Sequence, residues 1–185
     1  METSFGNITS SIWLIGDSAP LQWIKDLKHP LDQRHPTVHN IWTPIIYRIQ
    51  KHIFTEKSII IVDEENIFFI RNAVHNDNQK PARNVVEWNE AMNKKLIEMK
   101  DEIHKHNPKM IITFGAFAFE FLQRCTISNS DQRQKYGYWG AEKLGEIFVN
   151  NVKNKEVIVP LLHTSICKRH WLESKEKFTR IKDGN

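Results

Sequence analysis

The amino-acid sequence predicts an α/β fold with a mainly parallel central sheet. Short, strongly apolar runs that are typical of buried strands alternate with longer segments whose apolar residues recur every three or four positions. Three of the apolar runs end in a single polar residue, namely Asp17, Asn72 and His163. Because ligands bind at the carboxyl ends of parallel strands, these three residues are the first candidates for a functional site.

The size and composition of the chain indicate a soluble globular protein. Its 185 residues suit one core, so we expect a single domain over residues 1–185. Hydrophobic residues make up 40% of the chain and charged residues 26%, and no apolar run approaches the roughly 20 residues that span a bilayer. The N-terminus lacks the pattern of a secretory signal, and the two cysteines, Cys125 and Cys167, lie far apart. We therefore expect a cytoplasmic protein without an iron–sulfur or zinc site.

The N-terminal part of the chain is predicted to alternate strands and one helix. A buried strand at 11–16 is followed by a loop rich in proline and histidine. A helix is expected at 37–54, with Pro44 kinking it or shifting its start. Two β-branched or aromatic runs, at 58–62 and 67–71, are read as strands.

The strongest helical pattern in the chain lies between residues 84 and 107. Its apolar positions recur every three or four residues and are Val85, Trp88, Met92, Leu96, Met99 and Ile103. Asn84 is the predicted N-cap, with Glu87 at the reciprocal position of a capping box. Asn107-Pro108 is expected to end the helix, and residues 76–81 form a polar loop before it.

The C-terminal part is predicted to contain three strands and two helices. In chain order these are a strand at 110–114, a helix at 116–123, strands at 147–149 and 157–161, and a helix at 171–181. Gly115 turns the first strand into its helix, and residues 126–140 form a polar and aromatic loop. The strands at 147–149 and 157–161 are expected to pair as a hairpin or to form a β-loop-β unit.

The three residues at strand ends offer complementary chemistry. Asp17 lies in Gly16-Asp17-Ser18-Ala19-Pro20, a tight turn in which backbone groups can approach a ligand. The amide of Asn72 can hydrogen-bond the edge of a planar heterocycle with one donor and one acceptor. A neutral His163 can donate to a developing oxyanion. Taken singly, each also fits a structural role, as an Asx turn or helix cap, a partner of a neighbouring backbone group, or a core histidine.

The net charge and the histidines give only weak indications of a nucleic-acid partner or a bound metal. The net charge is +4 and the pI about 9.0, which is compatible with a polyanionic partner. The basic run at 168–170 after His163 can meet phosphates or form a solvated face. His29, His35 and His39 share one region without the spacing of a ligand set, so no metal site is expected.

Taken in order, these segments resemble the uracil-DNA glycosylase superfamily over most of the chain. The matching segments are Gly16–Pro20 with the first motif, Pro36–Trp42 with the phosphate-contacting loop and helix start, Asn72–Val74 with the base-reading segment, Pro108–Ala118 with a strand-glycine-helix unit, and His163–Ser165 with the final motif, whose loop enters the minor groove. The resemblance implies a three-layer α/β/α fold around a mainly parallel sheet, and no cofactor.

The resemblance also implies an activity, that of a monofunctional DNA glycosylase acting on a base flipped out of DNA. Asp17 would stabilise the cationic sugar and orient water, His163 would donate to the base O2, and Asn72 would hold the Watson–Crick edge. The other substrate-binding residues would be Gly16, Ser18 and Trp23. The residues expected to contact DNA are Thr37, Thr164, Ser165, Lys168 and Arg169.

The chain departs from the family pattern at several positions. One additional residue stands between Gly16 and Pro20, so either Asp17 or Ser18 faces the sugar. Thr164 replaces the proline of the final motif, and the cysteines of the iron–sulfur branch are absent. Residues 21–22 (Leu-Gln) follow the motif proline, where the uracil-specific branch has a tyrosine that blocks C5 substituents. We therefore expect the substrate to be uracil or a C5-modified pyrimidine.

Two alternative functions stay open at this point. One is a catalytically inactive protein of the same fold that binds DNA or a partner, and the other is an enzyme that cleaves free nucleosides or nucleotides. For the leading hypothesis we expect a monomer that acts on double- or single-stranded DNA, away from membranes. Its biological role would be DNA repair by base excision or antiviral defence against phages with modified DNA.

Overall fold

The computed structural model describes residues 4–19, 28, 67–75, 77–82, 85, 87–127 and 141–161. The predicted helices at 37–54 and 171–181, the predicted strand at 58–62 and most of the predicted loop at 126–140 lie outside these residues. Within the described part of the chain, no helix combines the length and the apolar character needed to cross a bilayer.

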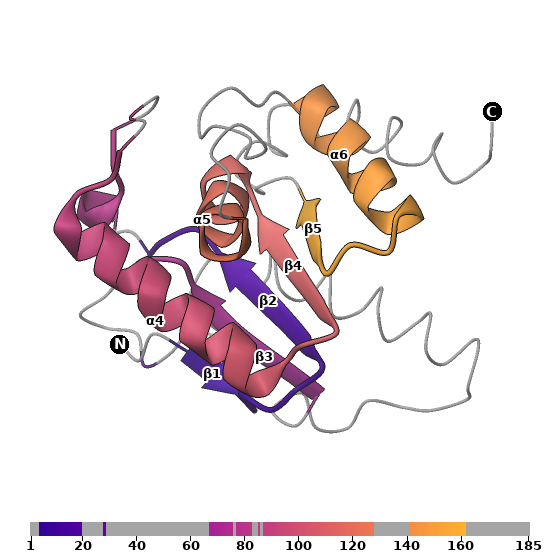
Figure 1. Ribbon diagram of the computed structural model, residues 1–185, viewed down its shortest axis with the longest axis horizontal. Coiled ribbons are helices and arrows are strands. Elements are labelled where there is room, and N and C mark those ends of the chain that lie inside the picture. The colour runs from indigo at the N-terminus through magenta and orange to yellow at the C-terminus, as the bar shows by residue number, and fades with distance from the viewer. Residues whose placement is uncertain are drawn as a thin grey trace.

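The described elements form a five-stranded sheet with three helices, which confirms the predicted α/β class (Figure 1). The strands are β1 (Ser4–Gly6), β2 (Ile12–Gly16), β3 (Phe68–Asn72), β4 (Met110–Phe114) and β5 (Ile158–Leu161), in the order β1-β3-β2-β4-β5. The pairs β2–β3, β2–β4 and β4–β5 are parallel, and only the short β1 pairs antiparallel, with β3. The sheet is therefore mainly parallel, as predicted, although β1 was not predicted.

The side chains of the central strands alternate between the two faces of the sheet. Trp13 and Ile15 of β2 and Phe69 of β3 lie in a core cluster with residues of α4 (Glu90–His106) and α5 (Ala116–Thr126). Leu14 and Phe68 belong to a second cluster on the opposite face. Figure 1 shows α4 lying across the face of the sheet that carries the first cluster. This period of two is the pattern expected of a strand buried on both faces.

Helix α4 begins later than its apolar pattern predicted. Its N-cap is Asn89, whose side-chain oxygen accepts a hydrogen bond of 3.0 Å from the backbone N–H of Met92. The prediction of Asn84 as the N-cap was therefore wrong. Trp88 continues the apolar spacing because it packs in the same core, with its ring stacked 6.2 Å from that of Phe121, although it precedes the helix. The helix ends at His106, next to the predicted end at Asn107-Pro108, and its C-cap Asn107 has the left-handed conformation.

The predicted strand at 147–149 is instead the middle of helix α6 (Ala141–Lys153). Leu144 and Ile147 stand three residues apart and pack with Phe119 of α5 and Ile158 of β5, which is helical spacing. The side-chain amide of Asn151 donates a 2.8 Å hydrogen bond to the carbonyl of Ile158. This hydrogen bond ties the last turn of the helix to the following strand. The predicted hairpin is therefore wrong, because β5 is reached through a helix and pairs in parallel with β4.

The buried thiol of Cys125 in α5 provides a test of the packing between α4 and α5. Burial raises the pKa of this thiol from 9.0 to about 12, and the nearby cations of Arg71 and Lys100 offset this only in part. Because the thiolate is the reactive form, a rise of three pKa units lowers its fraction at pH 8 about 1,000-fold. In a Cys167→Ser variant, we expect Cys125 to react with Ellman's reagent at least about 1,000-fold more slowly in the folded protein than in urea. Equal rates would contradict the described packing.

Candidate functional site

The carboxyl ends of the parallel strands define one edge of the sheet, which we call the carboxyl edge. It comprises Gly16, Asn72, Phe114 and Leu161, the last residues of β2, β3, β4 and β5. In Figure 1 the arrowheads of β2, β4 and β5 point the same way, toward this edge. The chain goes from β2 to β3 on one side and later returns to β4 on the other side of β2. Such a reversal of strand order is where open α/β sheets bind ligands.

The backbones of Asp17 and Asn72 lie side by side at this edge. Gly16 and Asn72 are register partners on adjacent parallel strands. The chain beyond β3 then stays on the end of β2, because the N–H of Ala73 donates to the carbonyl of Gly16 at 2.8 Å and the N–H of Val74 to that of Asp17 at 3.2 Å. These two hydrogen bonds continue the pairing of β2 and β3 beyond the ends of the strands and hold residues 16–17 against residues 73–74.

The carboxylate of Asp17 is largely withdrawn from solvent and paired with a cation. Its side chain is 16% exposed, and Lys80 Nζ lies 3.0 Å from Asp17 Oδ1. Oδ1 is buried and accepts no hydrogen bond from a described residue, so this contact is an ion pair alone. The ammonium also lies 6.0 Å from the ring centroid of Phe117, which is buried in α5. The charge of Asp17 therefore acts in surroundings that screen it less than water does.

The amide of Asn72 reaches the edge from one face of the sheet. Phe68 and Ile70 of β3 lie in the second core cluster, and alternation puts Asn72 on their side. Its neighbour Arg71 points to the helical face, where its guanidinium makes a 2.6 Å ion pair with Glu102 of α4. The Asn72 side chain makes no hydrogen bond to another described residue and is half-buried. The side chain of Asn72 therefore lies on the face of the sheet that carries the second core cluster.

The end of β4 contributes a glycine and a helix N-terminus to the edge. Gly115 has φ 91° and ψ 168°, a conformation that is open essentially to glycine alone. Its N–H donates a 2.8 Å hydrogen bond to the carbonyl of Leu161, and α5 begins at the next residue. The turn therefore brings the first N–H groups of α5 to the edge without a β-carbon in the way.

Two other predicted site residues, Gly16 and Ser18, also lie in the described part of the chain. Gly16 is buried and Ser18 half-buried, both beside Asp17. The remaining candidates lie outside the described residues and are Trp23, Thr37, His163, Thr164, Ser165, Lys168 and Arg169. The predicted imidazole follows the described end of β5, at Leu161, by two positions in the sequence. Of the predicted set, the structure thus places Asp17 and Asn72 at the ends of adjacent strands.

Two residues at the edge were not predicted from the sequence. Lys80 lies eight residues after Asn72, in a segment that was predicted only to be a polar loop. Nothing in the sequence of this segment indicates that Lys80 pairs with Asp17. His75 follows the same strand, and its ring atom Nδ1 is buried without a hydrogen bond from a described residue. Within the described ranges, no three side chains of His, Cys, Asp or Glu gather as metal ligands do.

Comparisons with known proteins do not identify the chain. No protein-family model matches it, and no curated protein sequence matches it either.

Proposed function

We propose that the protein is a monofunctional DNA glycosylase that hydrolyses the N-glycosidic bond of uracil or of a C5-modified pyrimidine. The observation that carries this proposal is that the backbones of Asp17 and Asn72 lie together at the ends of adjacent parallel strands in the centre of the sheet. In the proposal, the complete fold is a three-layer α/β/α sandwich of the uracil-DNA glycosylase type. DNA is the partner, the target nucleotide is flipped out, and no cofactor takes part.

The proposed reaction needs one polar group near the sugar and another near the base, on either side of the bond that breaks. As the bond between C1′ and the base nitrogen breaks, its electron pair leaves with the base and positive charge develops on the sugar. A water oxygen then bonds to C1′, and its proton passes to solvent or to the departing base. A carboxylate below the sugar and an amide on the base edge meet these demands, and the positions of Asp17 and Asn72 at the ends of adjacent strands support this assignment.

The surroundings of Asp17 suit electrostatic stabilisation of the sugar. Two unit charges 4 Å apart interact by about 4 kcal/mol at an effective dielectric constant of about 20, against about 1 kcal/mol in water. The side chain of Asp17 is 16% exposed, which places it nearer the first regime. In the proposal, His163 takes the negative charge of the leaving base, and the basic residues after it, Lys168 and Arg169, contact phosphates.

The role proposed for Asn72 predicts a change of base preference. An amide can rotate to match either a uracil edge or a cytosine edge, whereas a carboxylate only accepts hydrogen bonds. Asn72→Asp should therefore favour the cytosine-type edge, which offers an N4 donor, over uracil, whose O4 is an acceptor. We expect the ratio of kcat/KM for 5-hydroxymethylcytosine over uracil to rise by about tenfold or more. Asn150→Asp, on the exposed surface of α6, is the control. An unchanged ratio would contradict the role of Asn72.

The activity itself is tested by base release. The protein is incubated with duplexes and single strands that carry uracil, 5-hydroxymethyl-pyrimidines or glucosylated pyrimidines, and free bases are identified by mass spectrometry. We expect one base class to be released, leaving abasic sites that alkali cleaves. DNA binding without release would instead support the inactive binding protein. Turnover of free nucleosides with none on DNA would support the nucleoside enzyme.

A further inference from the structure

Lys80 is the charged residue that the structure adds to the predicted site. Its ammonium lies 3.0 Å from Asp17 Oδ1, and its side chain is only 22% exposed. A lysine on a solvated loop keeps its ammonium in water, so this degree of withdrawal indicates a held conformation. The contact joins two residues that are 63 positions apart in the sequence.

The segment after β3 brings Lys80 back to Asp17. Backbone hydrogen bonds from Ala73 and Val74 fasten the start of this segment to the end of β2. The side chain of Gln79 then accepts a 3.0 Å hydrogen bond from the backbone N–H of His75, which closes the loop around the short helix η2 (Asp77–Gln79). Lys80 is the next residue after this closed turn, so its backbone position is set by the same segment that carries Asn72.

The ring of Phe117 sets the other side of the ammonium position. Phe117 is 1% exposed in the first turn of α5, and its centroid lies 6.0 Å from Lys80 Nζ. At this distance the ring face attracts a cation weakly and also limits where the ammonium can move. The cation therefore stands between a buried aromatic ring and the carboxylate of Asp17.

We infer that Lys80 is a positioning residue for Asp17, an inference that rests on the proposed glycosylase function. A carboxylate has two equivalent oxygens, and an ion pair at Oδ1 leaves Oδ2 as the oxygen that faces the sugar and the water. Lys80 acts through Asp17 and does not contact the substrate. Its positive charge also weakens, in part, the attraction between the Asp17 carboxylate and the cationic sugar.

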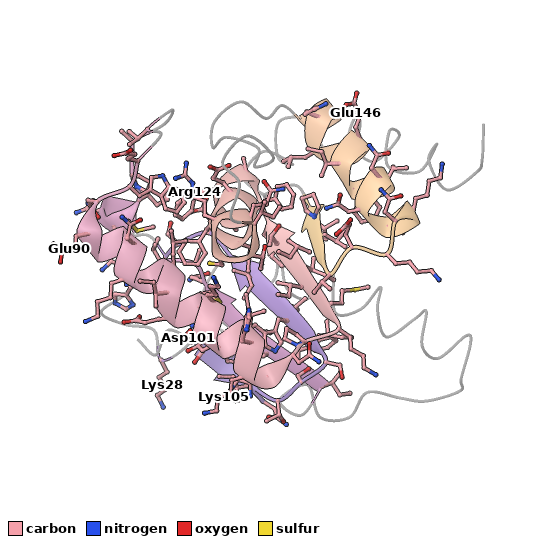
Figure 2. All side chains as sticks on the ribbon, in the orientation of Figure 1. Lys28, Glu90, Asp101, Lys105, Arg124 and Glu146 are labelled. Carbon is pink, nitrogen blue, oxygen red and sulfur yellow. The ribbon has the colours of Figure 1, made fainter. Side chains whose placement is uncertain are left out.

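The inference is tested by separating rate from affinity. Lys80→Met should lower the single-turnover rate at saturating DNA by about 10- to 100-fold, the cost of a misplaced group, with the dissociation constant for DNA changed less than about threefold. Lys80→Arg retains the cation and should recover most of the rate. Lys105→Met removes the same charge near the end of α4, close to the amino ends of the strands (Figure 2), and should leave the rate unchanged.

Two results would overturn the inference. One is a Lys80→Met variant with the wild-type saturating rate and a salt dependence of binding about one unit shallower, because Lys80 would then bind a phosphate. The other is an equal loss of rate in Lys80→Met and Lys105→Met, which would indicate a general effect of charge.

If the wild-type protein releases no base, the proposed function is wrong. The contact between Lys80 and Asp17 can then still be tested by measuring stability. The melting temperatures of Asp17→Asn, Lys80→Met and the double variant are then compared. We expect the double variant to lose less than the sum of the single losses, because each single variant already removes the contact between the two side chains. Additive losses would show that Lys80 does not hold Asp17.

Discussion

Asp17→Asn is expected to lower the single-turnover rate of base release by about 100- to 1,000-fold, with DNA affinity changed less than about threefold. The size of the effect is that of removing one preorganised charged or hydrogen-bonding group from a site that excludes water. The side chain keeps its volume but loses the negative charge that, in the proposed reaction, stabilises the cationic sugar. Rates are measured by quenched-flow or manual sampling on the best substrate, and affinity by fluorescence anisotropy.

Two further variants show whether the loss belongs to the reaction. Glu102→Gln also breaks a part-buried ion pair, with Arg71, but on the helical face of the sheet, and should leave the rate within about twofold. Ser18→Ala decides which residue of the turn serves the sugar, since we expect it to lose much less rate than Asp17→Asn. A larger loss in Ser18→Ala would transfer the role to Ser18.

Trp13→Ala is expected to have the largest effect on stability, about 3–5 kcal/mol. The side chain is fully buried between β2 and α4, its ring centroid lies 4.8 Å from that of Phe69, and its indole N–H donates a 3.1 Å hydrogen bond to the carbonyl of Ser10. Truncation would leave a cavity and would remove the indole N–H that donates to this carbonyl. Urea denaturation measures the loss. Trp13→Phe should cost clearly less, because the aromatic contact is kept.

The matched control for Trp13 is an apolar residue on the opposite side of α4. Ile97 is 61% exposed, and Ile97→Ala should change the free energy of unfolding by less than about 0.5 kcal/mol. If Trp13→Ala cost no more than Ile97→Ala, the packing of β2 against α4 would be wrong.

The central strands were predictable because burial on both faces leaves a plain signal. The run predicted at 110–114 is β4 itself, and those predicted at 11–16, 67–71 and 157–161 differ from β2, β3 and β5 by a residue or two. The run at 147–149 has the same local composition, yet it is helical because Leu144 and Ile147 pack on one face of α6. A run of three apolar residues is too short for its periodicity to separate a strand from a helix.

The positions of Asp17 and Asn72 at strand ends were predictable because the strands before them were. Asp17 and Asn72 each follow a run that reads as a strand, and parallel pairing puts such ends side by side. Lys80 could not be predicted, because its partner is chosen by how a closed turn folds back over the sheet. The left-handed backbone at Gly115 explains why the sequence has a glycine where β4 meets α5.

The central claim is that the carboxyl edge of this sheet hydrolyses an N-glycosidic bond in DNA. Its most direct test is mass spectrometry of the bases released from a mixed pool of modified DNA by the wild-type protein and by Asp17→Asn. We predict release of free uracil or of a C5-modified pyrimidine by the wild-type protein, and a loss of about 100-fold or more in the variant. No free base from any strand, or equal release by both proteins, would contradict the claim.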